Sequence, residues 1–150
     1  MNKVYYAHLR KTISSLTEGE EDVVSLMATV VCELYHSDHR FDWTGFYRVT
    51  SPGMLKIGPY QGSHGCLKIP FERGVCGAAA RLGKTQLVAD VEAFEGHIAC
   101  ASSTMSELVL PVWDKAGALI AVLDIDSDQP NAFTEQDAAE LEIILAKVFS

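Results

Sequence analysis

Apolar residues recur at the spacing of one helical face in two parts of the chain, one near each end. Residues 20–35 carry such a stripe, which predicts an amphipathic helix, and a shorter helix is expected before it, from about Lys3 to Ser15. The first stripe consists of Val23, Met27, Val30, Val31 and Leu34. Near the other end, Thr134 and Asp137 form a capping-box pattern ahead of a second stripe. That stripe consists of Leu141, Ile144, Leu145 and Val148.

Six short segments rich in β-branched and aromatic residues predict a sheet for these stripes to cover. They are residues 42–50, 54–60, 66–71, 85–90, 106–114 and 118–126. The sequence DKAG at 114–117 is the clearest hairpin turn, and residues 74–84 indicate a short helix closed by Gly83. We therefore expect one α+β domain over residues 1–150. Its antiparallel sheet carries the terminal helices on one face, and on the other the loops and short helix of a small-molecule pocket.

Charge and hydropathy narrow the range of partners. The formal net charge of -8 repels phosphate backbones, and the basic residues are scattered, so nucleic acid is not an expected partner. The N-terminus has no signal-peptide core, and no run approaches the ~20 apolar residues of a membrane span. We expect a cytoplasmic protein without a membrane partner. In that compartment, its four cysteines should be free thiols, metal ligands or redox groups.

Three acidic residues are candidates for proton chemistry. Asp124 and Asp126 lie two residues apart, so a strand turns both to one face, continuing the row of Ile120 and Val122. Glu107 opens the neighbouring strand and joins them if the hairpin pairs the two strands. Like charges so close raise at least one pKa and give an acid that donates a proton near neutrality. Spacing alone leaves two alternatives: acids at a solvated strand edge, or a Mg or Ca site, although no EF-hand-type loop is present.

Two aromatic residues suggest a pocket wall. Trp43 and Tyr47 flank Gly45 on one face of a predicted strand, which leaves a bare gap between the rings. Such a gap could hold a methyl or sulfur group, and the rings favour a sulfonium-like or cationic ligand. The alternative is that both are ordinary core aromatics.

The cysteines divide into two kinds. Cys32 lies among apolar residues of the second helix, which predicts a buried, inert thiol. Cys66, Cys76 and Cys100 lie in glycine-rich or polar surroundings. Cys76 lies near a predicted helix N-terminus, and Cys100 lies close in sequence to His97. Either surrounding lowers the pKa of a thiol, so thiolate character is plausible for both cysteines. Their spacing lacks the paired ligands of a zinc site, and leaves structural thiols and a redox set as alternatives.

Several segments, taken in order, make the chain resemble a known family over nearly its whole length. They are WTGFY, GPYQG, CLKIPFERGVCG, DVEAFEGHIAC, SELVLPV and AVLDIDS. In these the chain resembles the free methionine-(R)-sulfoxide reductases, single-domain enzymes with the GAF fold. The resemblance implies reduction of free L-methionine (R)-sulfoxide through cysteine sulfenic acid and disulfide chemistry. It also implies recycling by a thioredoxin-type dithiol, no metal or other cofactor, and a homodimer as the candidate assembly.

The resemblance also implies roles for individual residues. Cys100 is the attacking thiolate, Cys66 the principal resolving thiol and Cys76 a third redox cysteine. The residues implied around the substrate are Trp43, Tyr47, Glu107, Asp124 and Asp126. The chemistry suits these groups, because a thiolate attacks the sulfoxide sulfur while an acid protonates the oxygen.

Two positions depart from the family pattern, and one other function remains to be weighed. Family members usually carry Asp directly after the catalytic cysteine and Asn before the Ser-Glu pair, where this chain has Ala101 and Met105. Loss of the adjacent anion favours the thiolate of Cys100. The alternative function is a non-catalytic GAF sensor for a small molecule, which the fold alone does not exclude. A sensor would not need three loop cysteines together with three converging acids.

Overall fold

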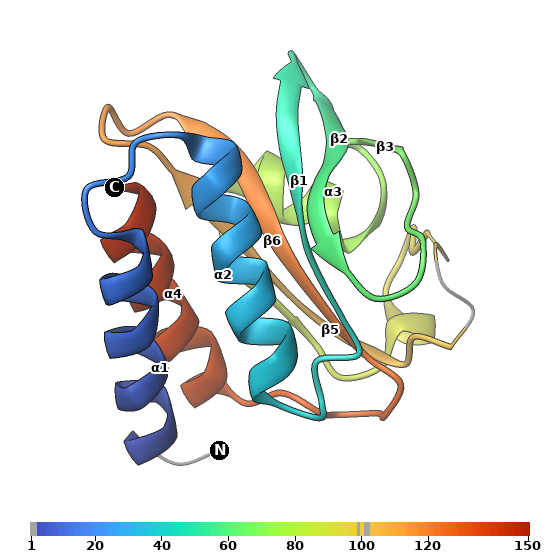
Figure 1. Cartoon of the computed structure of the whole chain (residues 1–150). Coiled ribbons are helices and arrows are strands. Elements are labelled where there is room, and N and C mark those ends of the chain that lie inside the picture. Colours follow the sequence, from blue (N-terminus) through green and yellow to red (C-terminus); the bar gives the residue numbers. More distant parts are fainter. Residues whose placement is uncertain (1–2, 99, 101–102) are drawn as a thin grey trace.

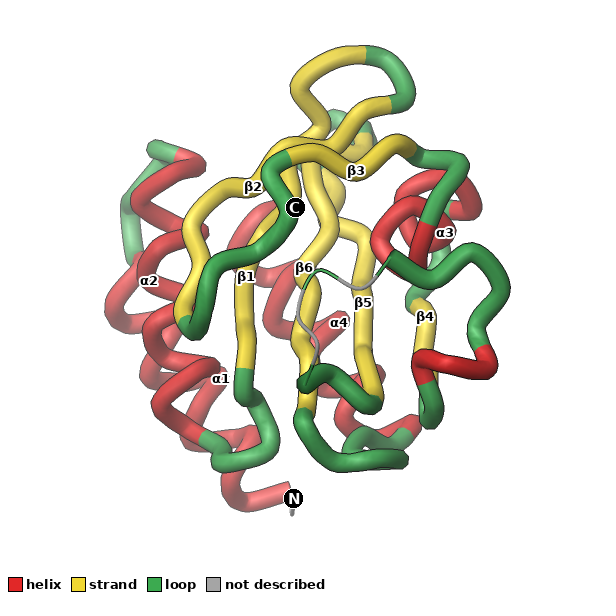
Figure 2. Tube along the Cα trace, turned by 90° about the vertical axis from the view of Figure 1, so that its right-hand side faces the viewer, coloured by secondary structure: helices red, strands yellow, loops and turns green. Residues whose placement is uncertain are grey.

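The computed structural model describes residues 3–98, 100 and 103–150. Its strands form a six-stranded antiparallel sheet in the order β3-β2-β1-β6-β5-β4 (Figures 1 and 2). The strands are β1 (Trp43–Ser51), β2 (Met54–Gln61), β3 (Lys68–Pro70), β4 (Gln86–Val88), β5 (Ser106–Trp113) and β6 (Leu119–Ser127). The helices are α1 (Lys3–Thr17), α2 (Val23–Ser37), α3 (Gly74–Leu82) and α4 (Glu135–Phe149), with a short 3-10 helix η1 (Val91–Ala93). The predicted α+β architecture is confirmed.

The helices α1, α2 and α4 cover one face of the sheet, as predicted for the terminal helices (Figure 1). Their apolar stripes bury against the residues of β1, β5 and β6 that point to this side, including Phe46, Leu110 and Leu123. Val23 was expected in the stripe of α2 but is 41% exposed. It is the first residue after the N-cap Asp22, so it precedes the part of the helix that reaches the core.

The start of α4 is fixed by a buried polar network. Thr134 and Asp137 form the predicted capping box. The Asp137 carboxylate also accepts hydrogen bonds from the Tyr6 hydroxyl at 2.7 Å and from Arg40 at 2.8 Å, and Arg40 binds Asp38 as well. Burial acts to raise the pKa of Asp137, but the hydrogen bonds outweigh it and hold the pKa at about 2. The network therefore ties α4 to α1 and to the end of α2.

Replacing Asp137 with asparagine should lower the free energy of unfolding by roughly 2 to 3 kcal/mol at pH 7, because Arg40 loses a charged, buried partner. The lowered folded-state pKa means that this contribution is present above about pH 3.8 and is lost as the pH falls towards 2. Urea denaturation of the wild-type protein and the variant, at pH 7 and at the acid end of this range, measures the difference in their free energies of unfolding. The exposed Glu135→Gln in the same helical turn is the control. Equal stability of the two variants at pH 7 would contradict the role of the network.

The other face of the sheet carries α3 and the long loops (Figure 2). As predicted, α3 closes at Gly83, whose φ of 63° lets its backbone N–H donate to the Ala79 carbonyl at 2.9 Å. A second apolar cluster lies here, built on Tyr47, Val109 and Val122 of the three central strands. These strands therefore alternate between a helix-side core and a pocket side.

A bulge in β6 corrects one detail of the predicted alternation. Ile120 was expected in the same row as Val122 and the two aspartates, but it packs against the helix-side core, while Leu119 lies on the pocket side. The register between β5 and β6 shifts between Val112 and Trp113, which leaves one extra residue on β6. The alternation is regular only beyond this point.

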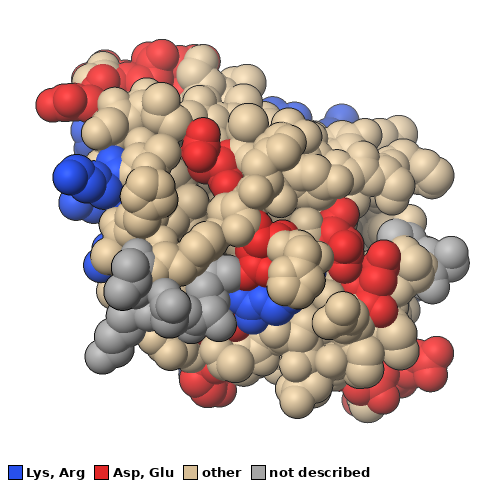
Figure 3. Space-filling model, turned by 60° about the horizontal axis from the view of Figure 1, so that its bottom comes forward, with Lys and Arg blue, Asp and Glu red and all other residues tan. Residues whose placement is uncertain are grey.

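The surface adds two observations. On the face seen in Figure 3, Lys and Arg atoms form separate patches among acidic ones, in keeping with the net charge of -8. Among the described helices, none has the length and apolar character needed to cross a bilayer.

Candidate active site

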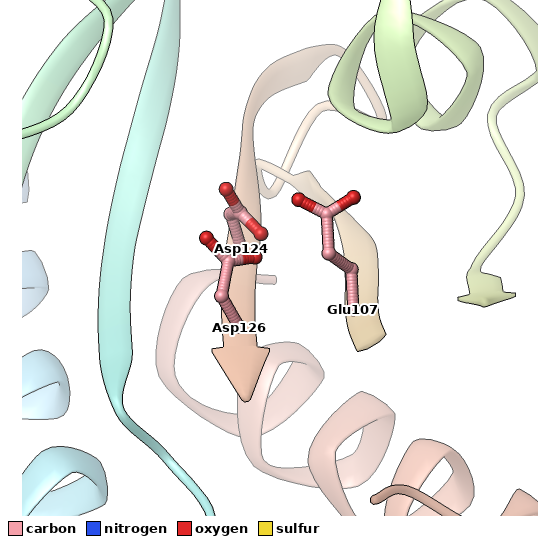
Figure 4. A group of neighbouring side chains, drawn as sticks. All are labelled: Glu107, Asp124 and Asp126. Carbon is pink, nitrogen blue, oxygen red and sulfur yellow. The ribbon is translucent and has the colours of Figure 1, made fainter. Parts of the chain in front are cut away.

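Strand pairing brings the three predicted acids together. Glu107 of β5 lies directly opposite Asp126 of β6, and Asp124 follows on the same face of β6. Figure 4 shows the three carboxyl groups turned into one space, and one oxygen of each lies within 4.8 Å of the others. Their exposed fractions are only 7% for Glu107, 5% for Asp124 and 8% for Asp126. The predicted convergence is confirmed, and the alternative of a solvated strand edge is wrong.

Burial changes the protonation of these acids. It is the main cause that raises the pKa of Glu107 to about 8, and the charge of Asp124 adds to it. Burial together with both neighbours raises the pKa of Asp126 well above its usual range. Each acid has a buried oxygen that receives no hydrogen bond from the described N–H and O–H donors. The carboxyl groups are close enough to share one cation or a proton.

The acids form the floor of a small cavity. Its walls include Trp43, Tyr47 and Cys76 on the sheet and helix side, and His97 and Cys100 on the loop side. The cavity volume is about 30 Å³, whereas a single water needs roughly 10–15 Å³. In this disulfide-bonded form the site is therefore nearly closed.

The two predicted aromatics lie on the cavity wall but leave no gap between them. Trp43 and Tyr47 stack with ring centroids 5.8 Å apart, and Trp43 stacks on Tyr60 at 5.3 Å. A Cβ on Gly45 would lie 2.6 Å from the Trp43 ring and 2.5 Å from Tyr60 Cβ. The prediction that a ligand group fills the space at Gly45 is therefore wrong, because Trp43 and Tyr60 fill it. The indole N–H of Trp43 donates to the Ser63 carbonyl at 2.7 Å, which fixes the ring.

Cys66 and Cys100 form a disulfide across 34 residues of sequence, with their Cα atoms 5.2 Å apart. Cys100 lines the cavity above the acids. Cys76 also lines it but is free and buried within α3, not in a loop. Burial, and after it the charges of the acids, raise the pKa of Cys76 well above its usual range. The predicted thiolate character of Cys76 is therefore wrong, because burial and the charges of the neighbouring acids favour the protonated thiol.

Cys32 is exposed, which corrects the prediction of a buried thiol. The buried residues of α2 include Val30, Val31 and Leu34, and position 32 lies on the opposite side of the helix. Its sulfur lies 3.9 Å from Nδ1 of His36. Cys32 therefore belongs to the outer surface of the helix layer, on the far side of the sheet from the cavity.

The two departures from the family pattern differ in what the structure shows. The backbone N–H of Met105 donates to the Ser127 carbonyl at 2.8 Å, and its carbonyl accepts from Val91 at 3.0 Å, so the chain after the Cys100 loop is anchored through its backbone. Ala101 lies outside the described residues.

Sequence reasoning missed His64, which lines the cavity two residues before Cys66. Its only sequence signal is its place in the GSHG segment.

Comparisons with known proteins agree with this site. A GAF domain model matches residues 17–148. The free methionine-R-sulfoxide reductase of Escherichia coli is 38% identical over 149 residues, which cover 99% of this chain and 89% of the relative. The solved free methionine-R-sulfoxide reductase from Neisseria meningitidis, in complex with its substrate, matches with a TM-score of 0.90 at 37% identity, covering 99% of this chain and 89% of that one.

A third match bears on the alternative function. A structure described as a putative GAF sensor protein from Burkholderia vietnamiensis superposes with a TM-score of 0.92 at 38% identity, covering 98% of this chain and 92% of that one. The fold is thus shared by proteins described as enzymes and as sensors. From the GAF domain match and the identity to the reductases along nearly its full length, this chain belongs to the free methionine-R-sulfoxide reductase family of GAF domains.

Proposed function

We propose that this protein reduces the (R)-sulfoxide of free methionine to methionine. The observation that carries the proposal is the Cys66–Cys100 disulfide beside three buried carboxyl groups with raised pKa values. A cysteine pair supplies two electrons, and a carboxylic acid supplies a proton at neutral pH. These are the requirements for removing oxygen from a sulfoxide. The names of the E. coli and N. meningitidis relatives point to the same reaction.

In the proposed reaction, the Cys100 thiolate attacks the sulfoxide sulfur while Asp126 or Glu107 protonates the oxygen. Overall the oxygen atom passes to the Cys100 sulfur, which gives methionine and a sulfenic acid. The Cys66 thiol then condenses with the sulfenic acid, forming the disulfide and releasing water. An external dithiol of the thioredoxin type restores both thiols by exchange and is itself oxidised to a disulfide.

The size of the cavity supports an order for these steps. A volume of about 30 Å³ admits water but not an amino acid, so we propose that substrate enters only when the disulfide is reduced. In the reduced protein, the acidic floor suits the α-ammonium group of a free amino acid. Trp43 and Tyr47 would then border the methylthio end of the substrate.

The direct test is to incubate the purified protein with methionine (R)-sulfoxide and dithiothreitol and to assay free methionine. The (S)-sulfoxide serves as the control substrate. Methionine formed from the (R) form alone supports the proposal, and no methionine above the protein-free level refutes it. Replacing dithiothreitol by thioredoxin, its reductase and NADPH then tests the physiological reductant.

The sensor alternative lacks a supporting observation within the site. A sensor needs a ligand cavity, but it has no use for a disulfide beside acids that hold protons.

Other expectations remain predictions: a single domain over residues 1–150, a cytoplasmic location and a homodimer. A redox role for Cys76 also remains a prediction, and the burial of its thiol counts against it.

A further inference from the structure

The two halves of the disulfide are placed differently with respect to the cavity. Cys100 is among the residues that line the cavity, whereas Cys66, its half-buried partner, is not among them in the described part of the chain. A thiolate that attacked Cys100 would need room in a volume of about 30 Å³, which holds only a few waters. Attack on Cys66 needs no room in the cavity. Since thiol–disulfide exchange depends on access to the attacked sulfur, Cys66 is the better target for a bulky reductant.

The segment just before Leu67 is held in place but leaves its backbone unpaired. Gly65 packs closely on the cavity wall, since a Cβ there would lie 2.9 Å from the Tyr47 hydroxyl. The carbonyl of Leu67 accepts a backbone hydrogen bond from β2 at 3.0 Å. Within the described chain, the N–H and C=O groups of residues 64–66 have no hydrogen-bond partner. Unpaired backbone of this kind can bind an extended segment of another protein.

An exposed apolar side chain directly follows Cys66. Leu67 is 73% exposed, the largest fraction among the exposed large apolar residues of the described chain. A single exposed leucine is ordinary on a protein surface, but this one lies beside a bond that another molecule has to reach. Burial of Leu67 against that molecule would stabilise the complex.

The charge of this part of the chain differs from that of the rest. Residues 43–71 contain no acidic residue, although the chain has 20 of them. The charged residues in this range are Arg48, Lys56 and Lys68, which lie opposite one another across β1, β2 and β3. Lys68 is two residues from Cys66. A partner with a neutral or acidic surface therefore meets no repulsion from this segment.

We propose that a thioredoxin-type dithiol docks on residues 64–67 and attacks the sulfur of Cys66, not that of Cys100. As the partner's thiolate bonds to Cys66, the S–S bond breaks and Cys100 leaves as a thiolate. The partner's second thiolate then attacks the partner's sulfur in the mixed disulfide and releases Cys66. The partner ends as a disulfide, and the two protons of its thiols pass to Cys66 and Cys100. The inference rests on the proposed function, for which it names the surface that the reductant binds.

The attacked sulfur can be identified without any sulfoxide. The Cys32→Ser protein, which lacks the exposed free thiol, is oxidised with diamide and mixed with an excess of thioredoxin whose second active-site cysteine is serine. This thioredoxin stops at the mixed disulfide because it lacks the thiol for the second step. After an acid quench, digestion and mass spectrometry should find thioredoxin joined to Cys66.

An adduct on Cys100 overturns the inference. So does the absence of any adduct when dithiothreitol still reduces the disulfide. Both results are independent of methionine formation. Failure of the wild-type protein to form methionine refutes the proposed function instead.

A pair of leucine variants tests the docking surface. Leu67→Ser should lower kcat/KM for reduction of the disulfide by thioredoxin by on the order of ten-fold, because a contact of a buried leucine is lost. Leu67→Met, which keeps an apolar side chain, should restore it. Dithiothreitol needs no docking surface and should reduce every variant at the wild-type rate. Leu82→Ser, which removes a 56% exposed leucine at the C-terminal end of α3, is the control.

Equal rates of reduction by thioredoxin for Leu67→Ser and Leu82→Ser would contradict the docking surface. A loss in Leu67→Ser that dithiothreitol shows as well would contradict it too, because the change would then act on the disulfide itself.

Discussion

Replacing Cys100 with serine should abolish methionine formation with every reductant, because a hydroxyl is a far weaker nucleophile toward sulfur than a thiolate. The rate is expected to fall by on the order of a thousand-fold or more, as when an enzyme loses its nucleophile. The exchange removes no large side chain and should leave the fold unchanged, which circular dichroism can verify. Methionine formed at the wild-type rate by this variant would remove Cys100 from the proposed role.

The matched variant is Cys66→Ser, which removes the other half of the disulfide. It should still form one equivalent of methionine per protein but should turn over slowly with thioredoxin, because attack on the sulfoxide precedes resolution. If this first equivalent is missing, Cys66 is the nucleophile. Cys32→Ser serves as the control for general thiol loss, since Cys32 is exposed and lies on the helix layer. It should leave turnover unchanged.

Neutralising the acids should have the second largest effect. Glu107→Gln, Asp124→Asn and Asp126→Asn keep the shape of each side chain but remove its charge and its acid–base function. A ten- to thousand-fold loss of turnover is expected where the acid donates the proton. In the wild-type protein, the rate should also fall as the pH rises through about 8, where Glu107 loses its proton. Asp128→Asn, an exposed carboxylate just beyond β6, is the control.

Substrate choice separates proton donation from substrate binding by the same acids. If the acids of the cavity floor bind the α-ammonium group, N-acetylated methionine (R)-sulfoxide should be a much poorer substrate than the free amino acid. Equal rates with the two substrates would contradict the binding role. Full activity in all three acid variants would contradict both roles.

Much of the fold can be predicted from local sequence signals, because each signal acts within a few residues. The N-cap of α4 at Thr134 and the C-cap of α3 at Gly83 depend on side-chain and backbone geometry that is determined by residues close in the sequence. The convergence of the acids follows from the two-residue period of β6 and the tight hairpin that pairs it with β5. The pairing of Cys66 with Cys100 came from the family resemblance, since spacing alone left the cysteines unassigned.

The errors arise where tertiary packing decides. The apolar residues around Cys32 in the sequence suggest burial, although the phase of the helical stripe places it opposite the buried side. The ring of Trp43 occupies the space beside Gly45 through a rotamer that no strand period reveals. For Cys76, the sequence indicates a helix N-terminus but not the burial that raises the pKa of its thiol.

The bulge in β6 makes the β5–β6 hairpin tolerant of a change in its length. The bulge lies at residue 120, between the turn at 114–117 and the two aspartates. The orientation of the aspartates is set by the regular pairing of the rest of β6 with β1 and β5. A residue gained or lost in the hairpin can therefore be absorbed at the bulge without turning the acids into the helix-side core. We therefore expect that a peptide inserted at the tip of the β5–β6 hairpin leaves the two aspartates facing the cavity.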